Sequence, residues 1–254
     1  MSTGDEYLRG LITKYAAPTG PNAPVLQQLT PVYATIRSWA GSHLLNLSLS
    51  GSYAKGTAVH GDADADLFIS LASTATQTLR EIFESLRDTF SQKGYAVREQ
   101  NVSIRLSIGK FSVDLVPAKK QAGNTTDHSL YVRKHRSWQQ TNIQTHIALI
   151  TSSGRREEIL LLKIWRAEQQ LDFPSIYLEL CTLRALSGKP RGDVANNVWA
   201  VLHFLRDDLA TARIVDPANT NNIISDDMTA REKAFIAAAA SRSLTKKYWS
   251  EVIW

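Results

Sequence analysis

Two aspartates separated by one residue, Asp64 and Asp66, stand directly before the apolar run 67–69. In an extended strand, residues i and i+2 project from the same face, so the pair predicts two neighbouring carboxylates. Carboxylates this close repel each other, and a divalent cation bound beside them relieves the repulsion. The pattern therefore predicts a strand whose beginning carries a metal site.

The residues upstream predict a second strand that ends in a glycine-bracketed turn. Positions 45–50 alternate between leucine and a small polar residue, which is the period of a half-buried strand. The following segment, GSYAKGT at 51–57, offers hydroxyl groups and backbone N–H groups that suit phosphate oxygens. We predict that the residues holding phosphate are Gly51, Ser52, Lys55 and Thr57.

A third carboxylate, Asp114, lies in the run FSVDLVP at 111–117. Apolar and polar residues alternate over 102–108, and Gly109-Lys110 then forms a two-residue turn of the hairpin type. This hairpin would place Asp114 on a strand next to the one that carries Asp64 and Asp66.

These elements together resemble the signature of the DNA polymerase β-like nucleotidyltransferases, with a Gly-Ser turn, an acidic–x–acidic pair and a later carboxylate. The resemblance implies an α+β fold, with a palm of mixed sheet and flanking helices plus a mostly helical second domain. It also implies that the catalytic and metal-binding residues are Asp64, Asp66 and Asp114. The alternative is a set of solvated acids on an edge strand.

Three carboxylates can hold two Mg²⁺ ions about 4 Å apart, one at the attacking hydroxyl and one at the triphosphate. Mg²⁺ prefers oxygen ligands shared with phosphates, and Mn²⁺ is expected to substitute. In this scheme Asp64 and Asp66 bridge both ions, and Asp114 serves the acceptor hydroxyl and helps to take its proton. Asp62 is interpreted as a solvated loop acid.

The pattern changes after Pro117, where a polar loop precedes a mostly helical remainder. We therefore predict a catalytic domain with N-terminal helices over 1–120 and a helical nucleotide- and acceptor-binding domain over 121–254. Helical spacing is predicted over 79–94 and 157–171, and a new helix is expected to begin at Pro174.

Lys163 lies in an apolar helical stretch, where an ammonium group needs an anion. In the family, a lysine on one helix and a serine opening the next hold the triphosphate, and LLKIW followed by FPSIYLEL is similar to that pattern. The resemblance assigns nucleotide contacts to Lys163, Ser175, Tyr177 and Asn222. Alternatively, Lys163 extends to solvent, Ser175 only caps its helix, and the loop with Asn222 is structural.

Two segments resemble the 2′-5′ oligoadenylate synthetase and CD-NTase branch, namely SWQQTN at 137–142 and DPANTNN at 216–222. HSLYV at 128–132 is instead similar to an element of archaeal CCA-adding enzymes. Tryptophans 138, 165 and 199 are predicted to be core residues rather than base-stacking platforms. The basic run 133–136 fits a phosphate-binding rim or a solvated face equally well.

A net charge of +5 favours polyanionic partners. The single cysteine, Cys181, suits a reducing cytosol, and the absence of a long apolar run or a signal-peptide pattern indicates a cytoplasmic protein without membrane contact. The base preference, bond type, oligomeric state and any activator stay open.

The expected reaction is Mg²⁺-dependent, template-independent transfer of a nucleoside monophosphate from ATP or another NTP to a nucleotide hydroxyl. The resemblance implies a linear or cyclic oligonucleotide signal, as in antiviral defence. The alternatives are addition to an RNA 3′ end, with RNA as acceptor or activator, transfer to an aminoglycoside, and a non-catalytic nucleotide sensor.

Overall fold

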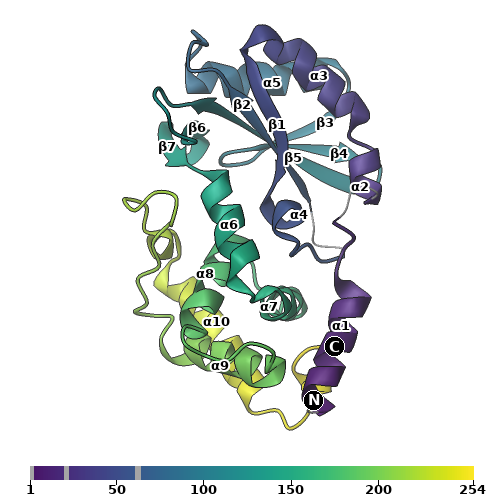
Figure 1. The fold of residues 1–254 in the computed structure, drawn as a ribbon, viewed down its shortest axis with the longest axis vertical. Helices are drawn as coiled ribbons and strands as arrows, with labels where there is room; N and C mark the ends of the chain where they lie inside the picture. The colour runs from purple at the N-terminus through teal and green to yellow at the C-terminus, as the bar shows by residue number, and fades with distance from the viewer. Residues whose placement is uncertain (1–2, 20–22, 61–63) are drawn as a thin grey trace. The chain divides into compact units, whose positions relative to one another are not determined.

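The computed structural model describes residues 3–19, 23–60 and 64–254, which form two compact units (Figure 1). The sheet unit comprises Pro18–Gly56 and Ala63–Ile147. The helical unit comprises Met1–Ala17, Thr57–Asp62 and Ala148–Trp254. The chain therefore passes between the units several times, and neither unit is a continuous segment.

A mixed sheet forms the centre of the sheet unit, in the strand order β1-β2-β5-β4-β3, with β6 paired to β5 and β7 to β6. β2 and β5 are parallel, and the other pairs are antiparallel. The strands are β1 (Leu44–Ser50), β2 (Ala65–Leu71), β3 (Ala96–Glu99), β4 (Ile104–Ile108), β5 (Phe111–Lys120), β6 (His128–Val132) and β7 (Ser137–Thr141).

Helices α3 (Thr30–Ala40) and α5 (Leu79–Gln92) lie together over the sheet, joined by a 3.1 Å hydrogen bond from Trp39 Nε1 to Ser85 Oγ (Figure 1). α5 begins at a capping box in which Thr78 and Glu81 satisfy each other's backbone N–H groups. Its predicted apolar face is buried, as expected. The shorter elements are α2 (Pro24–Gln27), α4 (Gly51–Lys55), η1 (Gly41–His43) and η2 (Arg133–His135).

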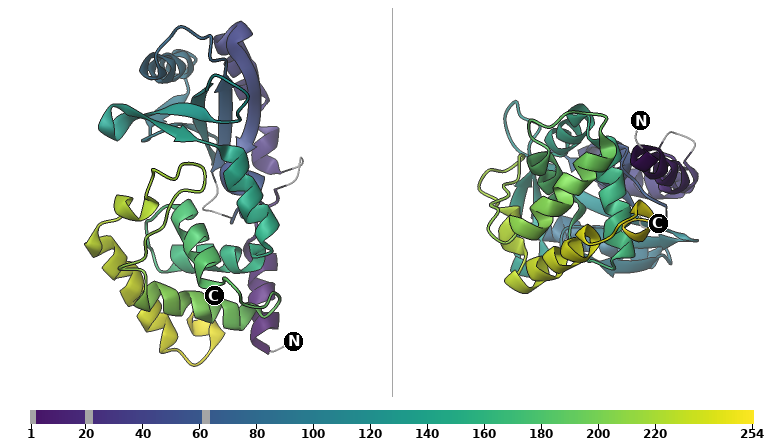
Figure 2. Two further views of the ribbon diagram at one scale, coloured as in Figure 1. Left: turned by 60° about the vertical axis from the view of Figure 1, so that its left-hand side comes forward. Right: turned by 90° about the horizontal axis from the view of Figure 1, so that it is seen from below.

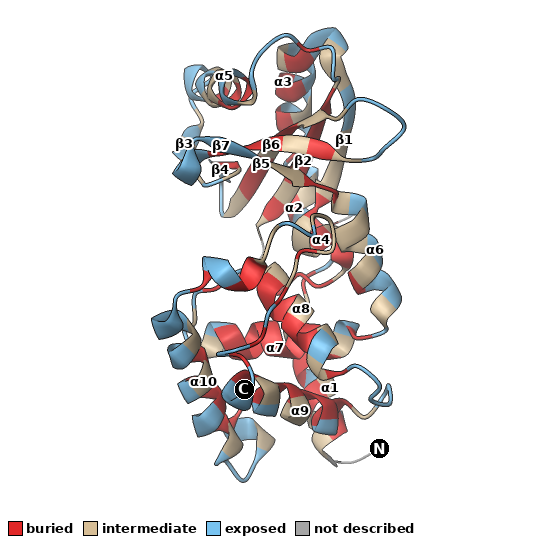
Figure 3. Ribbon diagram, turned by 90° about the vertical axis from the view of Figure 1, so that its left-hand side faces the viewer, coloured by how far each residue is buried: buried red, intermediate tan, exposed pale blue. Residues whose placement is uncertain are grey.

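The helical unit has a continuous apolar core, which Figure 3 shows as buried residues along α7 and α8. Trp165 is fully buried in it, as predicted, and its indole N–H donates to Ser243 Oγ at 2.9 Å. Both chain ends lie in this unit (Figure 2), where the Tyr7 hydroxyl donates to the Ile253 carbonyl at 3.0 Å. Its helices are α1 (Thr3–Tyr15), α7 (Arg156–Glu168), α8 (Ser175–Ala185), α9 (Val194–Asp207), α10 (Ala230–Leu244), η3 (Ile224–Asp227) and η4 (Trp249–Glu251), and α6 (Ile143–Ser153) links the units.

The α+β fold class is confirmed, but the observed units depart from the predicted division at 120/121 in two places. β6 and β7 extend the sheet past residue 121, because Ala118, Lys119 and Lys120 pair with β6. At the other end, α1 packs against α7 and α9, because its buried Leu8 and Leu11 belong to the helical core. No helix in the described ranges is long and apolar enough to cross a membrane.

Candidate active site

Two of the predicted catalytic carboxylates lie side by side in the sheet. Asp66 on β2 is directly paired with Asp114 on the parallel strand β5, and neighbouring strands lie about 4.8 Å apart. Asp64 comes two residues before Asp66, a spacing that places both side chains on the same face of an extended chain. Asp114 is buried, whereas Asp64 and Asp66 are partly exposed. The fold thus brings the three predicted carboxylates to one edge of the β2–β5 pair, while Asp62 lies outside the described residues.

Gly51 is required by the position of Asp66. Its φ of +57° falls in the left-handed region that favours glycine. A Cβ atom at this position would lie 1.7 Å from Asp66 Oδ2, far inside contact distance. The glycine of the predicted Gly-Ser turn therefore makes room for a carboxylate, and the turn itself continues as the short helix α4.

The carboxylates are electrostatically coupled. Burial, as the largest cause, and the negative charges of Asp114 and Asp64 together raise the pKa of Asp66 to about 7. Lys55 and Arg105 act against this rise. Three carboxylates that disfavour one another's charge form a donor set that a divalent cation would stabilise.

Arg105 on β4 is bound to this cluster. Its Nε donates to Asp114 Oδ1 at 2.9 Å, and its Nη2 donates to Asp114 Oδ2 at 2.8 Å and pairs with Asp64 Oδ2. A bidentate guanidinium–carboxylate pair is among the stronger polar contacts in proteins. Arg105 therefore supplies positive charge at the place where the resemblance implies metal ions.

The donor set fits Mg²⁺ chemically, because it consists of carboxylate oxygens and is short of positive charge. In the described residues, however, no group of three or more acidic, histidine or cysteine side chains is arranged to hold a metal ion. Asp64 and Asp114 instead form ion pairs with Arg105. Arg105 thus occupies carboxylate oxygens that a metal ion would also use.

Arg105 lies outside the predicted motifs, but the hairpin register locates it. The predicted two-residue turn pairs Ile108 with Phe111 and so fixes the hairpin register. Counting back along both strands places Arg105 opposite Asp114. Residues that face each other on neighbouring strands lie on the same side of the sheet.

The other turn residues divide between two roles. Lys55 is buried and lowers the pKa of Asp66, so its charge acts on the carboxylates. Ser52 is partly exposed in α4. Thr57 is fully buried in the helical unit, where its hydroxyl accepts a 2.8 Å hydrogen bond from Lys163 Nζ. The structure thus places Thr57 on a lysine rather than at an open phosphate site.

Lys163 finds its anion within the protein. Its ammonium lies 2.7 Å from Glu179 Oε1 on α8, and both side chains are almost wholly buried. A buried ammonium group needs an anion and hydrogen-bond acceptors. Glu179 supplies the anion for Lys163, and Thr57 accepts its hydrogen bond. The pair ties α7 to α8.

Ser175 opens α8, as predicted. Its hydroxyl accepts a 3.1 Å hydrogen bond from Arg166 Nη1, which also donates to the Phe173 carbonyl at 2.7 Å. Both line a pocket of about 440 Å³ in the helical unit. Tyr177 has no exposed surface and packs edge-to-face on Phe173 at 6.3 Å. Its position is that of a core residue rather than of a ligand contact.

Asn222 closes the loop 216–222 on itself. Its Nδ2 donates to Asp216 Oδ2 at 3.2 Å, and its carbonyl accepts from the Asp216 N–H at 2.9 Å. Asp216 also accepts from the Ala218 N–H at 2.8 Å. These contacts make the loop a compact turn, which is the structural alternative considered for this segment.

Comparison with known protein families identifies a match for the segment that carries the carboxylates. Residues 33–153 match the SMODS family, described as a Second Messenger Oligonucleotide or Dinucleotide Synthetase domain. This match indicates a nucleotidyltransferase, and the chain has the fold of the polymerase β-like enzymes. Among curated proteins, no sequence matches it significantly.

Solved nucleotidyltransferase structures share the fold. CdnC of E. coli MS115-1 with ATP has a TM-score of 0.75 at 20% identity, covering 95% of this chain and 90% of its own. The CD-NTase CdnG of Bradyrhizobium diazoefficiens with GTP has a TM-score of 0.74 at 13% identity, covering 96% and 92%. The CdnE cyclic dinucleotide synthase of Elizabethkingia meningoseptica with GTP and Apcpp has a TM-score of 0.72 at 13% identity, covering 95% and 99%.

The SMODS match includes all three carboxylates and Arg105 but ends before α7. His128, in the segment similar to CCA-adding enzymes, is buried. Its Nε2 lies 2.7 Å from Ser70 Oγ, and its Nδ1 lies 2.9 Å from the carbonyl oxygen of Thr126. These bonds hold β6 in the sheet of the nucleotidyltransferase. Trp138, predicted as a core residue, is instead 61% exposed, because β7 lies at the end of the sheet.

Proposed function

We propose that this nucleotidyltransferase transfers a nucleoside monophosphate from ATP or another NTP to the hydroxyl of a second nucleotide and makes a cyclic oligonucleotide signal. The acceptor oxygen bonds to the α-phosphorus, the bond from that phosphorus to the β-phosphate oxygen breaks, and pyrophosphate leaves. The proton of the acceptor hydroxyl passes to a base, for which Asp114 is the candidate. The names of the similar proteins, with bound ATP or GTP and cyclic dinucleotide synthesis, support this choice of substrates and product.

The observation that carries the proposal is the direct pairing of Asp66 with Asp114, with Asp64 two residues upstream, inside the SMODS match. We propose that these carboxylates hold Mg²⁺, or Mn²⁺ in its place. The ions would supply charge for the leaving pyrophosphate and lower the pKa of the attacking hydroxyl. Arg105 must first release Asp64 and Asp114, and its guanidinium then becomes available to an anion.

The remaining residues serve phosphate binding in this proposal. Gly51 and Ser52 present backbone and hydroxyl groups beside Asp66, and Lys55 contributes charge from α4. Lys163 and Ser175 are proposed contacts of the outer phosphates, with Glu179 and Arg166 holding them in place. Thr57 and Tyr177 support these residues by packing, and the loop with Asn222 is proposed to lie near the base.

The test follows radiolabel from α-labelled ATP in purified protein supplied with mixed NTPs and Mg²⁺ or Mn²⁺. A parallel reaction contains bulk tRNA. We expect pyrophosphate release and small labelled products that resist phosphatase, since a cyclic product has no terminal phosphate. Asp66→Asn is the matched control, because it removes a charge and keeps the volume.

Two results would replace the proposal. Label found only on the tRNA 3′ end would assign RNA as the acceptor. ATP binding in Mg²⁺ without pyrophosphate release in either reaction would support a nucleotide sensor.

A further inference from the structure

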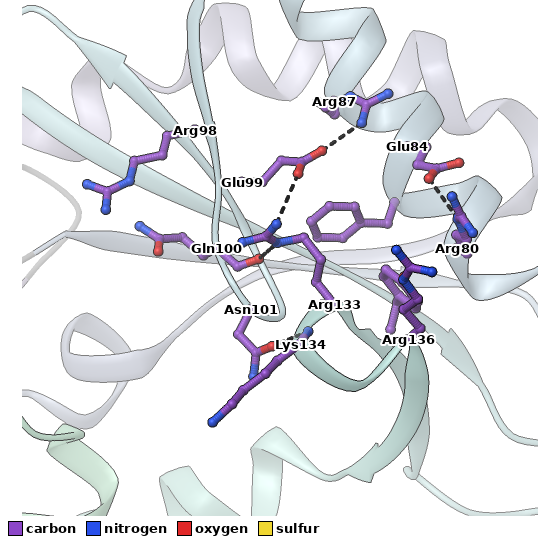
Figure 4. A pocket seen from close by; sticks show the side chains of 12 residues that line it. Arg80, Glu84, Arg87, Arg98, Glu99, Gln100, Asn101, Arg133, Lys134 and Arg136 are labelled. Atoms are coloured by element: carbon purple, nitrogen blue, oxygen red, sulfur yellow. Dashed lines mark hydrogen bonds and ion pairs between the residues drawn. The ribbon is translucent and has the colours of Figure 1, made fainter. Parts of the chain in front are cut away.

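A groove of about 780 Å³ in the sheet unit carries a concentration of positive charge outside the carboxylate cluster (Figure 4). It lies between α5, the end of β3 and the β6–β7 hairpin. Two carboxylates, Glu84 and Glu99, are part of its lining. The six cationic side chains that line it are Arg80, Arg87, Arg98, Arg133, Lys134 and Arg136.

The two carboxylates are already engaged. Glu84 accepts from Arg80 Nε at 2.8 Å. Figure 4 shows Glu99 between Arg87, at 2.6 Å, and Arg133, at 3.6 Å. Within the described part of the chain, Arg98, Lys134 and Arg136 have no carboxylate partner. The groove therefore keeps an excess of positive charge that an anionic ligand would neutralise.

The cationic turn is fixed to the neighbouring loop rather than loosely solvated. The backbone N–H groups of Arg133 and Lys134 donate to the carbonyl and side-chain oxygens of Asn101, at 2.8 and 2.9 Å. Arg133 Nε donates to the Gln100 carbonyl at 3.2 Å. Arg136 adopts a φ of +48°, a conformation that residues other than glycine and asparagine seldom take. A site held in this way loses less conformational freedom when a ligand binds.

An exposed aromatic ring lies beside the groove. Tyr131 lines it and packs on Phe83 at 5.6 Å between ring centroids. Trp138 is directly opposite Tyr131 in the β6–β7 register, so both side chains lie on the same side of the hairpin. Trp138 is 61% exposed, which leaves an indole face open to solvent. An aromatic face next to arginines is the combination that binds unpaired bases and their phosphates.

We propose that this groove binds a single-stranded oligonucleotide, with its phosphates on the cations and a base on Trp138. Isolated phosphate would not use the indole, and a duplex keeps its bases stacked inside. Guanidinium groups also match phosphate oxygens in pairs. The strand is either an RNA segment or a short oligonucleotide of the kind the enzyme is proposed to make, and the two sources share phosphodiester chemistry.

The experiment measures fluorescence anisotropy of a labelled 12-nucleotide single-stranded RNA and of labelled linear diadenylate in EDTA, where no transfer occurs. Binding is therefore independent of the proposed transferase function. We expect the double variant Lys134→Glu/Arg136→Glu to bind at least tenfold more weakly and Trp138→Ala about tenfold more weakly. The salt dependence of the double variant should also flatten, by about 0.7 in slope for each lost phosphate contact.

The matched control is Lys246→Glu/Lys247→Glu, which makes the same charge change at exposed positions of the helical unit. It should bind within twofold of the parent, and excess ATP should not displace the RNA. Equal weakening in the control, an unchanged groove variant, or equal competition by octaglutamate or duplex RNA would overturn the proposal. Tighter binding of the RNA identifies an RNA strand as the ligand, and equal or tighter binding of diadenylate identifies a short product.

Discussion

Arg105 holds the Asp114 carboxylate with two hydrogen bonds of 2.9 and 2.8 Å, from the strand directly beside it. Without this guanidinium, a buried carboxylate would face Asp66 with no fixed positive charge bound to it. Losing a hydrogen bond to a charged group costs about 1.5–3 kcal/mol. We expect Arg105→Met to lower the Tm in EDTA by about 5 °C, measured by differential scanning calorimetry.

Mn²⁺ should then raise the Tm of Arg105→Met more than that of the parent, because a cation replaces the missing guanidinium. Arg98→Met is the control, since Arg98 is paired with Arg105 in register but is exposed and has no carboxylate partner among the described residues. Equal Tm changes for both variants, or an equal response to Mn²⁺, would contradict the assignment.

Gly51→Ala should abolish transfer. The new methyl group meets Asp66 Oδ2 at 1.7 Å and also strains a left-handed backbone. Gly109→Ala provides a close match, because its φ is +59° and nothing lies within 4 Å of its Cβ position. Both variants should lose about 1 kcal/mol or more of stability from backbone strain, but we expect only Gly51→Ala to lose at least a hundredfold in pyrophosphate release. Comparable activity losses in both would mean that strain, and not the carboxylate, matters.

Asp114→Asn should impair transfer more than donor binding, because this carboxylate is proposed to serve the acceptor hydroxyl. We expect the rate of pyrophosphate release to fall at least a hundredfold, while the Kd for ATP, from equilibrium dialysis, changes less than tenfold. An affinity loss as large as the rate loss would show that Asp114 acts on the donor nucleotide instead.

Lys163→Met should destabilise the protein by about 3–5 kcal/mol, because it leaves Glu179 charged and buried. The double variant Lys163→Met/Glu179→Met should recover most of that loss, as measured by urea unfolding. It also separates structure from binding. If Lys163 contacts the outer phosphates, the refolded double variant should bind ATP about tenfold more weakly and AMP unchanged, whereas unchanged ATP binding would restrict the lysine to packing.

Glu168 gives a pH dependence of stability. Burial raises its pKa from 4.5 to about 7, and the Trp254 N–H donates to its Oε1 at 2.8 Å. At a pH between 4.5 and about 7, the Glu168 carboxyl group is deprotonated in the unfolded chain but stays protonated in the folded protein. The contribution of Glu168 to the free energy of unfolding is therefore fully present below pH 4.5 and is lost as the pH rises through 7.

Glu168→Gln keeps an acceptor for Trp254 and removes the charge. We expect a higher Tm than the parent at pH 8 and little difference at pH 5. Glu6→Gln, at an exposed position of α1, should show no such pH dependence. A Tm difference that is the same at both pH values would exclude the carboxyl group of Glu168 as its source.

Local patterns were sufficient to predict the catalytic strands. Alternation located β1 and β4, the Gly109-Lys110 turn placed β5 beside β4, and helical spacing located α5. The β6–β7 hairpin escaped prediction, because its turn places an arginine, Arg136, in the left-handed conformation where a glycine would have been the signal. The mostly helical remainder predicted after the polar loop therefore contains two paired strands over 128–141.

Contacts between residues that are far apart in the sequence could not be predicted from local patterns. The need of Lys163 for an anion was predicted, but its identity, Glu179, depends on how α8 packs against α7. The amphipathic pattern of α1 indicates that one face is buried, but it does not identify α7 and α9 as the helices that cover this face. Such choices are made by tertiary packing, which local propensity does not encode.

The discontinuous course of the helical unit also bears on its synthesis. Leu8 and Leu11 of α1 are covered in the native protein by helices that begin at residue 156 and beyond. At about 5–20 residues per second, a ribosome needs on the order of ten seconds to add the intervening chain. During that interval the apolar side of α1 has no native partner, while the sheet unit can already close. The apolar side of α1 is therefore open to non-native contacts until α7 and α9 have been made.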